Sequence, residues 1–356
     1  MKKAMKKEVK TEFFLFLLAI VTLFIFTSSL IYAEICECDS CTDCTNALNN
    51  KSCSEVILKA NITDYGQYCI NNPENFSNKI FDCQGNTIDG VGSGDGIYLD
   101  GKQNNTIKNC IITDFQFGIY LKSSSNNTLT NNTANSNIQS GIYLSSSSNN
   151  TLINNTANSN VNYYGIYLSS SSNNTLINNT ANSNNQSGIY LGFSHNNILT
   201  NNNASSNYYY GIYLFSSSNN ILTNNVVINS TTRDGIELQS SSNNILTNNI
   251  ASLNNQTGIY LSYSSNNTLT NNTVNSNRNI GIALGYSSNN NTLLNNNVSN
   301  NSERGISLYD SSNNTLVNNT ANSNGYGIYL ELSSNNTLTN NFVILNSQYG
   351  IYLYNS

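Results

Sequence analysis

The chain has 356 residues, of which 9% are charged, with one proline, no tryptophan and a formal net charge of −5. Five lysines among the first ten residues partly mask an acidic remainder, and beyond Lys122 there is no lysine and only three arginines. Binding to nucleic acid needs Lys and Arg clustered against the phosphates. The composition therefore argues against a nucleic-acid partner.

The first 33 residues have the pattern of an export segment. A lysine-rich start is followed by an apolar stretch from Phe13 to Phe26 and then by a small residue at Ala33. This order is typical of a cleavable signal peptide. The alternative is an uncleaved membrane anchor, because residues 13–32 are nearly long enough to span a bilayer. Either way, we expect a secreted or cell-surface protein that meets a membrane only through this segment.

Residues 34–60 are rich in cysteine, and we expect them to cap the first coil of the repeat that follows. An even number of cysteines outside the cytoplasm predicts disulfides, with the pairing left open. The alternative is one zinc or iron ion held by the first four cysteines, which lie close together in the sequence. No cofactor is predicted. The eight cysteines are Cys36, Cys38, Cys41, Cys44, Cys53, Cys69, Cys83 and Cys110.

From residue 61 onward the chain is repetitive. The phrase Gly-Ile-x-Leu occurs twelve times, at intervals of 22 to 24 residues. An Asn- and Ser-rich chain can be disordered, but a disordered tract has no physical reason to space Ile and Leu so regularly. Each repeat supplies two or three short strands, too few to fold alone, so neighbouring repeats must stack. The phrase begins at Gly96, Gly118, Gly141, Gly165, Gly188, Gly211, Gly235, Gly258, Gly281, Gly305, Gly327 and Gly350.

Register follows from strand geometry. The Ile and Leu of each phrase lie two residues apart and point inward, so the residue x points outward. A second phrase brings identical residues into columns, such as Asn132, Asn155 and Asn179. A buried Asn in such a column can donate to the same amide one coil away, which predicts an asparagine ladder. We therefore predict an all-β parallel β-helix of about 12 coils over residues 61–356.

The sequence ends at residues 350–356, part of the way through a coil. An exposed strand edge can pair with another chain. We therefore expect this uncapped C-terminal coil to pack against another molecule, as in self-association, or the natural polypeptide to be longer.

Residues 82–90 read Asp-Cys-Gln-Gly-Asn-Thr-Ile-Asp-Gly and are followed by Gly-Ile-Tyr-Leu and Asn-Asn-Thr-Ile-Lys-Asn-Cys-Ile-Ile. This segment resembles the opening coils of right-handed parallel β-helix repeat proteins of the NosD-like family, which are common among archaeal surface proteins. The resemblance extends over roughly residues 53–356 and implies a right-handed parallel β-helix. It implies little about function, because members include carbohydrate-binding and carbohydrate-cleaving modules, surface-layer components and accessory proteins for copper-enzyme maturation.

The accessory role in metalloenzyme maturation is the minor alternative. His195 is the only histidine, and both methionines, Met1 and Met5, lie in the leader. Only the N-terminal cysteines would remain as copper ligands. The composition therefore gives that role no support.

Catalysis on a polysaccharide needs paired carboxylates, or an arginine beside a carboxylate-bound calcium. From Ser123 to Thr232 there is no Asp, Glu, Lys or Arg, so these coils host neither chemistry. Five aspartates of the opening coils are interpreted as turn residues: Asp82, Asp89, Asp95, Asp100 and Asp114. A later charged cluster keeps a polysaccharide-cleaving enzyme open as the alternative, although we lean against an enzyme: Arg233, Asp234, Glu237, Arg278, Glu303, Arg304 and Asp310.

The outward residue x is Tyr in nine of the twelve phrases. Such a stripe suits stacking on sugar faces, so a glycan or cell-surface polymer is the expected partner. Two alternatives stay open. The tyrosines can simply stack on one another, or the recurrent Asn-x-Thr sequons, such as 126–128, can make the protein a glycosylated scaffold or adhesion rod. The six consecutive members are Tyr98, Tyr120, Tyr143, Tyr167, Tyr190 and Tyr213.

Overall fold

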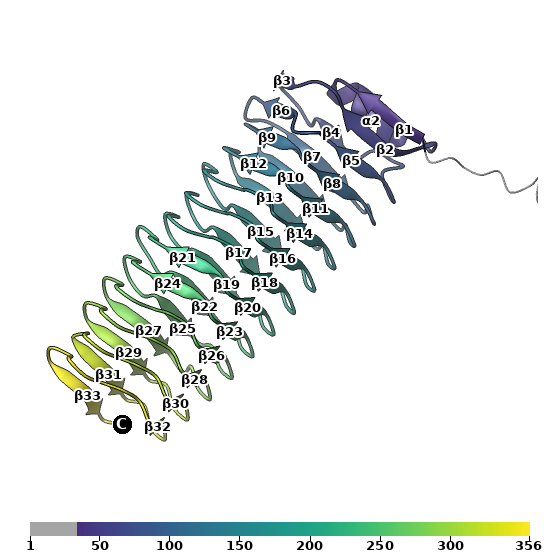
Figure 1. Cartoon of the computed structure of the whole chain (residues 1–356). Coiled ribbons are helices and arrows are strands. Elements are labelled where there is room, and N and C mark those ends of the chain that lie inside the picture. The colour runs from purple at the N-terminus through teal and green to yellow at the C-terminus, as the bar shows by residue number, and fades with distance from the viewer. Residues whose placement is uncertain (1–33) are drawn as a thin grey trace, which may run out of the picture. The chain divides into compact units, whose positions relative to one another are not determined.

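The computed structural model describes residues 34–356, and the expected signal or anchor segment lies outside them. Residues 35–356 form one compact unit in which the chain winds into stacked coils (Figure 1). Strands of successive coils pair in parallel, for example β10 (Phe117–Lys122) with β13 (Ser140–Ser145). The structure is therefore the parallel β-solenoid that the repeats predict.

One side of the solenoid is a 14-stranded sheet, here called sheet A. Its strands, in the order in which they pair, are β1 (Glu34–Cys38), β2 (Cys53–Leu58), β5 (Ile80–Asp82), β8 (Thr106–Lys108), β11 (Thr128–Thr130), β14 (Thr151–Ile153), β16 (Thr175–Ile177), β18 (Ile198–Thr200), β20 (Ile221–Thr223), β23 (Ile245–Thr247), β26 (Thr268–Thr270), β28 (Thr292–Leu294), β30 (Thr315–Val317) and β32 (Thr337–Thr339).

A second side is a 13-stranded sheet, here called sheet C, which carries the Gly-Ile-x-Leu phrases. Its strands, from the N-terminal end, are β4 (Ile70–Asn71), β7 (Asp95–Asp100), β10, β13, β15 (Ile166–Ser169), β17 (Ile189–Gly192), β19 (Ile212–Phe215), β22 (Ile236–Gln239), β25 (Ile259–Ser262), β27 (Ile280–Gly285), β29 (Arg304–Tyr309), β31 (Tyr326–Glu331) and β33 (Tyr349–Tyr354).

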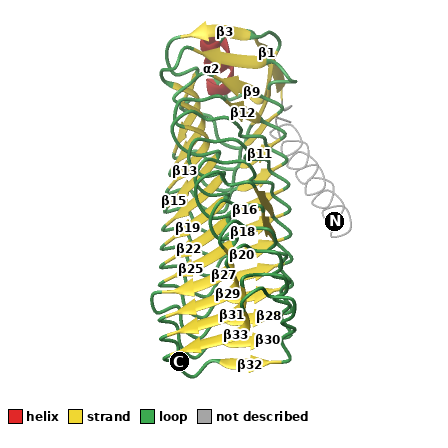
Figure 2. Cartoon of the chain, turned by 90° about the vertical axis from the view of Figure 1, so that its left-hand side faces the viewer, coloured by secondary structure: helices red, strands yellow, loops and turns green. Residues whose placement is uncertain are grey.

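The third side is mostly single bridges between coils, such as Thr156 with Thr180, and its regular strands are few (Figure 2). They are β3 (Ile62–Tyr65), β6 (Thr87–Gly90), β9 (Ile111–Thr113) and β12 (Thr133–Asn135) in one sheet, and β21 (Val226–Ile228) and β24 (Ile250–Ser252) in another.

The N-terminal end is closed by helix α2 (Cys41–Asn49). Ser40 caps the helix, and the buried Lys79 ammonium donates to the carbonyl of Leu48 at 2.7 Å. Backbone groups at both ends of the helix therefore have hydrogen-bond partners. Strand β2 already pairs with β5 within the segment expected to be a cap. The solenoid thus has about two turns more than the twelve phrases count, because its first turns lack Gly-Ile-x-Leu.

The core is built as the register predicts. Ile and Leu of the phrase are buried in nearly every coil, and Leu129 pairs with Leu152 on sheet A. The glycine of the phrase is needed because the coils approach closely there. A Cβ on Gly118 would lie 2.6 Å from the carbonyl oxygen of Gly141, one coil on. Larger residues are therefore excluded at this position.

The asparagine ladder is confirmed. Nδ2 of Asn132 donates to Oδ1 of Asn155 at 3.0 Å, and Asn155 donates in the same way to Asn179 at 3.0 Å. The second proton of the Asn155 amide goes to the carbonyl of Leu129. The sequence analysis did not predict two further ladders. One runs through Asn127 and Asn150, and the other includes Asn160 and Asn184.

The two residues of each Asn-Asn pair in the repeat have different structural roles. In the pair Asn131-Asn132, the first residue lies on an exposed turn with φ of 55° and the second lies in the ladder. Asn tolerates this left-handed conformation better than most residues. Sequon acceptors such as Asn126 and Asn131 are thus the exposed members of their pairs.

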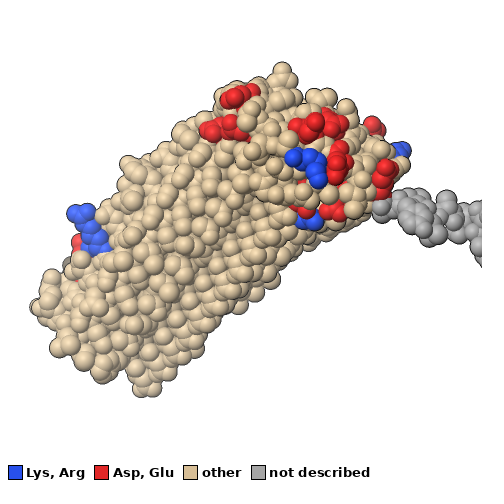
Figure 3. All heavy atoms as spheres, turned by 45° about the horizontal axis from the view of Figure 1, so that its top comes forward, with Lys and Arg blue, Asp and Glu red and all other residues tan. Residues whose placement is uncertain are grey.

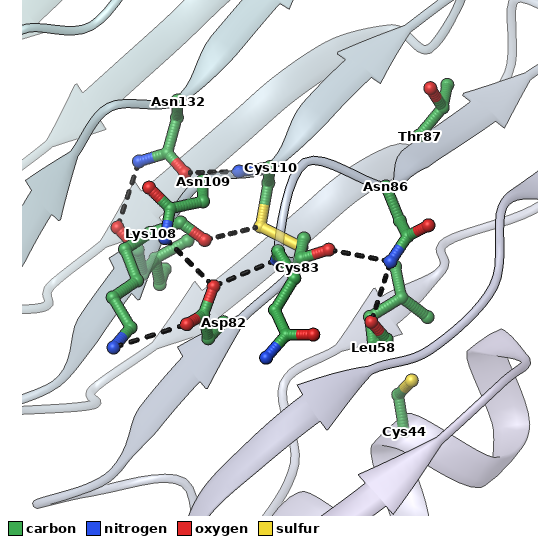
Figure 4. The surroundings of a disulfide bond; sticks show 12 residues. Cys44, Leu58, Asp82, Cys83, Asn86, Thr87, Lys108, Asn109, Cys110 and Asn132 are labelled. Atoms are coloured by element: carbon green, nitrogen blue, oxygen red, sulfur yellow. Dashed lines mark hydrogen bonds and ion pairs between the residues drawn. A yellow bond between two sulfur atoms is a disulfide. The ribbon is translucent and has the colours of Figure 1, made fainter.

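All eight cysteines are paired: Cys36–Cys53, Cys38–Cys44, Cys41–Cys69 and Cys83–Cys110. The metal alternative for the N-terminal cysteines is therefore wrong, because each of those thiols is in a disulfide. Figure 4 shows the Cys83–Cys110 bond between successive coils. Beside it, Asp82 accepts from the Gln84 amide at 2.8 Å and pairs with Lys108 at 3.3 Å, which is the turn role expected of it.

The last described coil leaves its inward residues uncovered. Ile351 is 50% exposed, whereas Ile328, its partner one coil earlier, is fully buried. This is the end at which the sequence predicts self-association, and that association stays a prediction.

Replacing Asn155 by Ala should destabilise the solenoid by roughly 1–3 kcal/mol, because the Asn132 amide and the Leu129 carbonyl lose their partner inside the core. Urea unfolding measures this change. The control is Asn154→Gly on the adjacent exposed turn, where φ is 54° and glycine fits. Equal unfolding midpoints for N155A and the wild type would contradict the ladder's role.

Candidate functional site

The outer face of sheet C is the candidate site. Its central column is the residue x of each phrase, and these residues align directly, Tyr120 with Tyr143 and Tyr143 with Tyr167. Each of these tyrosines is partly exposed, while the Ile and Leu on either side are buried. The sequence therefore places the predicted tyrosines correctly on one outward face.

The tyrosine rings stack on one another. From Tyr120 through Tyr143, Tyr167 and Tyr190 to Tyr213, successive ring centroids lie 4.7, 4.6, 5.0 and 5.1 Å apart, with interplanar angles of 8° to 16°. Tyr98 is tilted by 48° from Tyr120. Along the ladder each ring face meets a neighbouring ring. What the ladder offers to a ligand is therefore ring edges and phenol hydroxyls.

A second outward column, directly before the glycine, alternates between aromatic residues and serine: Phe117, Ser140, Tyr164, Ser187 and Tyr210. Phe117 packs on Tyr143 at 5.1 Å and Tyr164 packs on Tyr167 at 5.0 Å, so both rings rise above the ladder. The small Ser140 leaves a gap between them. The sequence analysis missed this column, although its alternation is visible in the sequence.

That gap is a pocket of ≈ 230 Å³, here called the slot. Phe117 and Tyr164 are its walls, and Tyr143 and Tyr167 of the ladder form its floor. The polar residues Gln139 and Ser140, together with Tyr163, complete the lining. An apolar pocket with a few polar groups is what a small organic ring requires.

Two phenols that line the slot are held in the neutral form. Burial, together with the neighbouring tyrosines, raises the pKa of Tyr164 far above its ordinary value, and burial also raises the pKa of Tyr167. The slot therefore holds hydroxyl groups that donate and accept hydrogen bonds and carries no charge. In Figure 3, on the face in view, most charged side chains gather near the N-terminal end, and a wide uncharged surface separates them from a small charged group toward the other end.

Three members of the predicted charged cluster come together where the tyrosine ladder is interrupted at Glu237. Nη1 of Arg233 lies 3.2 Å from the Tyr210 hydroxyl, and the Thr257 amide donates to Asp234 at 2.7 Å. Burial, reinforced by the charge of Asp234, raises the pKa of Glu237 to about 7. Burial also raises the pKa of Asp234 to about 6.

The other predicted members lie apart from these three. Arg278 donates to Asn255 at 3.0 Å and lines a separate pocket of ≈ 620 Å³ on the third side. Arg304 lies on sheet C against Tyr329, while Glu303 and Asp310 are exposed. The cluster is therefore one group of three residues and several separate charges.

The carboxylates of the opening coils mostly have structural partners. Thr113 donates to Asp89 at 2.6 Å, and Lys122 pairs with Asp100 at 3.0 Å. Asp95 differs, because it is 2% exposed, its Oδ1 has no hydrogen-bond partner among the described residues, and burial raises its pKa to about 7. Within residues 34–356, no three His, Cys, Asp or Glu side chains gather as metal ligands, and no helix is long and apolar enough to cross a membrane.

Raised carboxyl pKa values make the stability depend on pH. Native Glu237 and Asp234 keep protons that the unfolded chain loses above pH ~4.5, so the free energy of unfolding should fall as pH rises from ~4.5 to ~7. Glu237→Gln should remove roughly 3 kcal/mol of that fall, since about 2.5 pKa units separate the folded and unfolded states.

Urea unfolding at pH 4.5 and 7.5 gives the measurement, and Glu303→Gln, an exposed glutamate, serves as the control. A wild type that gains stability between these two pH values would contradict the placement of the buried carboxyls. So would an E237Q variant with an unchanged slope.

Comparison with known proteins confirms the architecture. Solved structures similar to this one include the periplasmic alginate epimerase AlgG (TM-score 0.58, 17% identity, 81% of this chain and 76% of that chain). Another is the mannuronan C-5 epimerase AlgE4 A-module of Azotobacter vinelandii (0.56, 17%, 86% and 93%). A third is the surface protein and adhesin PfbA of Streptococcus pneumoniae (0.58, 13%, 88% and 94%). At these identities the likeness shows the fold alone.

No curated protein matches the sequence. The family model described as "Right handed beta helix region" matches residues 75–227 and 222–356, which is most of the chain. That match also gives the hand of the coil. The NosD-like subgroup and an archaeal origin remain predictions. By its repeats, its stacked parallel coils and this match, the chain belongs to the right-handed β-helix family.

Proposed function

We propose that this protein is an exported, non-catalytic β-helix that binds carbohydrate on the outer face of sheet C. The observation that carries the proposal is the slot between Phe117 and Tyr164. A pyranose ring has apolar faces and polar edges, and it suits a gap with aromatic walls and a floor of hydroxyls. Because the ladder beneath is stacked and hydrogen-bonded, the slot needs little rearrangement on binding.

The slot favours a neutral sugar. No Asp, Glu, Lys or Arg occurs between Ser123 and Thr232, and the raised pKa values of Tyr164 and Tyr167 keep these two phenols protonated. A charged group placed here would lose hydration without gaining a partner. We therefore assign the slot to an uncharged hexose unit.

Binding is favoured over cleavage. Glu237 and Asp234 are 7% and 5% exposed. A substrate would have to displace the rings and strands around these carboxyls to reach them. Their raised pKa values are explained by burial in the sheet, which is a structural cause.

Export and surface location have support from the disulfides. Four disulfides form and persist in an oxidising compartment outside the cytoplasm. The structural neighbours, by their names, include polysaccharide epimerases and an adhesin, which agrees with a carbohydrate-related surface role. The alternative, a glycosylated scaffold, is favoured by exposed sequon acceptors such as Asn126 and Asn131. A scaffold function would not require the slot.

Two slot variants separate these functions. Tyr164→Ser removes a wall, and Ser140→Phe fills the gap with a ring of the kind that Phe117 already places in this column. Each should weaken binding of neutral hexose oligosaccharides by about fivefold or more, because a sandwiched ring loses an aromatic contact worth about 1 kcal/mol or more. Calorimetry on oligosaccharides selected from a glycan array measures the loss.

Tyr208→Ser is the matched control, since Tyr208 is 47% exposed and lies off sheet C. It should bind as the wild type does, and circular dichroism should show all three variants folded. A wild type that binds no glycan would overturn the proposal, and so would slot variants that bind with unchanged affinity.

A further inference from the structure

The tyrosine ladder is interrupted for two successive coils. Ala283 and Ser307 take the place of tyrosine between Tyr260 and Tyr329, and they pair directly in register. Gly285, at the end of the first of these strands, lies under the Tyr260 hydroxyl. This part of the outer face therefore has small residues where every other coil of the ladder, except that of Glu237, has a ring. We call it the ladder gap.

Arg304 occupies the ladder gap. Its guanidinium carbon lies 3.7 Å from the centroid of the Tyr329 ring, and Nη1 donates to the Ser307 hydroxyl at 3.2 Å. The stacking on Tyr329 is a cation–π contact, and the hydroxyl fixes the plane of the group.

Arg304 is in no ion pair among the described residues, and the nearby Glu331 instead accepts the Tyr329 hydroxyl at 2.9 Å. A guanidinium has five N–H donors, and Ser307 takes one of them. In a chain of net charge −5, Arg304 is therefore a fixed cation with unused N–H donors.

Exposed tyrosines border the ladder gap at a conformational cost. Tyr263 and Tyr286 are 58% and 46% exposed, and their rings stack at 5.4 Å. Both have left-handed φ angles, 51° and 52°, at a turn position where five of the twelve coils place serine. A bulky side chain is disfavoured in that conformation. Tyr309, two residues after Ser307, continues the group at 6.0 Å from Tyr286.

We propose that the ladder gap binds an acidic sugar unit, with Arg304 holding its carboxylate or sulfate ester and Tyr286 and Tyr309 contacting the ring. A planar guanidinium suits either anion because it donates two parallel hydrogen bonds. This inference rests on the proposed function and extends it. The slot takes a neutral unit, and the ladder gap, seven coils or about 34 Å further along, takes a charged unit of the same polymer. The ligand class is then an acidic polysaccharide that also contains neutral sugars.

The test compares three oligosaccharide probes on the full chain: a hexuronate oligomer, the same oligomer with its carboxyl groups reduced to alcohols, and a sulfated neutral oligomer. At least one anionic probe should bind about tenfold or more tighter than the reduced probe, since a hydrogen bond to a charged group contributes about 1.5–3 kcal/mol. Its affinity should also fall as salt rises, while that of the reduced probe should not.

Arg304→Gln should abolish this preference and leave binding of the reduced probe unchanged. Arg278→Gln is the matched control, because Arg278 is also unpaired by any carboxylate but lies outside the ladder gap. The uronate and sulfate arms identify which anion is recognised. Equal binding of anionic and reduced probes would overturn the inference while the slot proposal stands. An equal loss of the preference for the anionic probe in R304Q and R278Q would also overturn the inference. Arg304 would then only fill the place of a tyrosine ring by stacking on Tyr329. No binding of any probe would overturn both proposals.

Discussion

Hydrogen bonding between identical asparagine amides on successive coils is the interaction on which the rest of this structure depends. Each inner Asn, such as Asn155, donates to the next coil and to a backbone carbonyl, and accepts from the previous coil. A buried amide that lacked these partners would destabilise the fold by about 1–3 kcal/mol. The ladders therefore hold the coils in one register, because a slip of one residue would leave every amide in a column without its hydrogen-bond partner.

That register determines the surface as well as the core. Because like residues stack, tyrosine rings on sheet C lie about one strand spacing apart and face each other. A ladder of this kind is rigid, but it hides the ring faces that a sugar would use. Binding sites are therefore expected where the pattern breaks. The slot arises from the serines that separate rings in the column before glycine, and the ladder gap arises from Ala283 and Ser307.

Much of this was predictable from the sequence. The spacing of Gly-Ile-x-Leu predicted parallel coils, its Ile and Leu predicted the inward residues, and the Asn column predicted one of three asparagine ladders. These predictions succeed because the coils of a solenoid repeat the same local contacts, so that a position in one coil has the same environment in the next. The first turns, which lack the phrase, were not counted, because their strands β2 and β5 follow no repeat.

The sites were less predictable, for physical reasons. The sequence showed that the tyrosines point outward, but whether their rings face a ligand or each other depends on side-chain rotamers. The disulfide pairing depends on how α2 folds against β2 and β4, which no repeat determines. Arg304 appeared as one charge among seven, and its stacking on Tyr329 follows from a neighbour one coil away in the stack.

Hydrogen exchange of asparagine side-chain amides, followed by NMR on protein labelled with ¹⁵N only in asparagine, tests the stacking most directly. The structure predicts two populations, with ladder amides such as those of Asn155 and Asn179 exchanging roughly 100-fold or more slowly than exposed turn amides such as that of Asn154. A single population that exchanges at the rate of exposed asparagine would contradict the ladders, and with them the register on which both proposed sites depend.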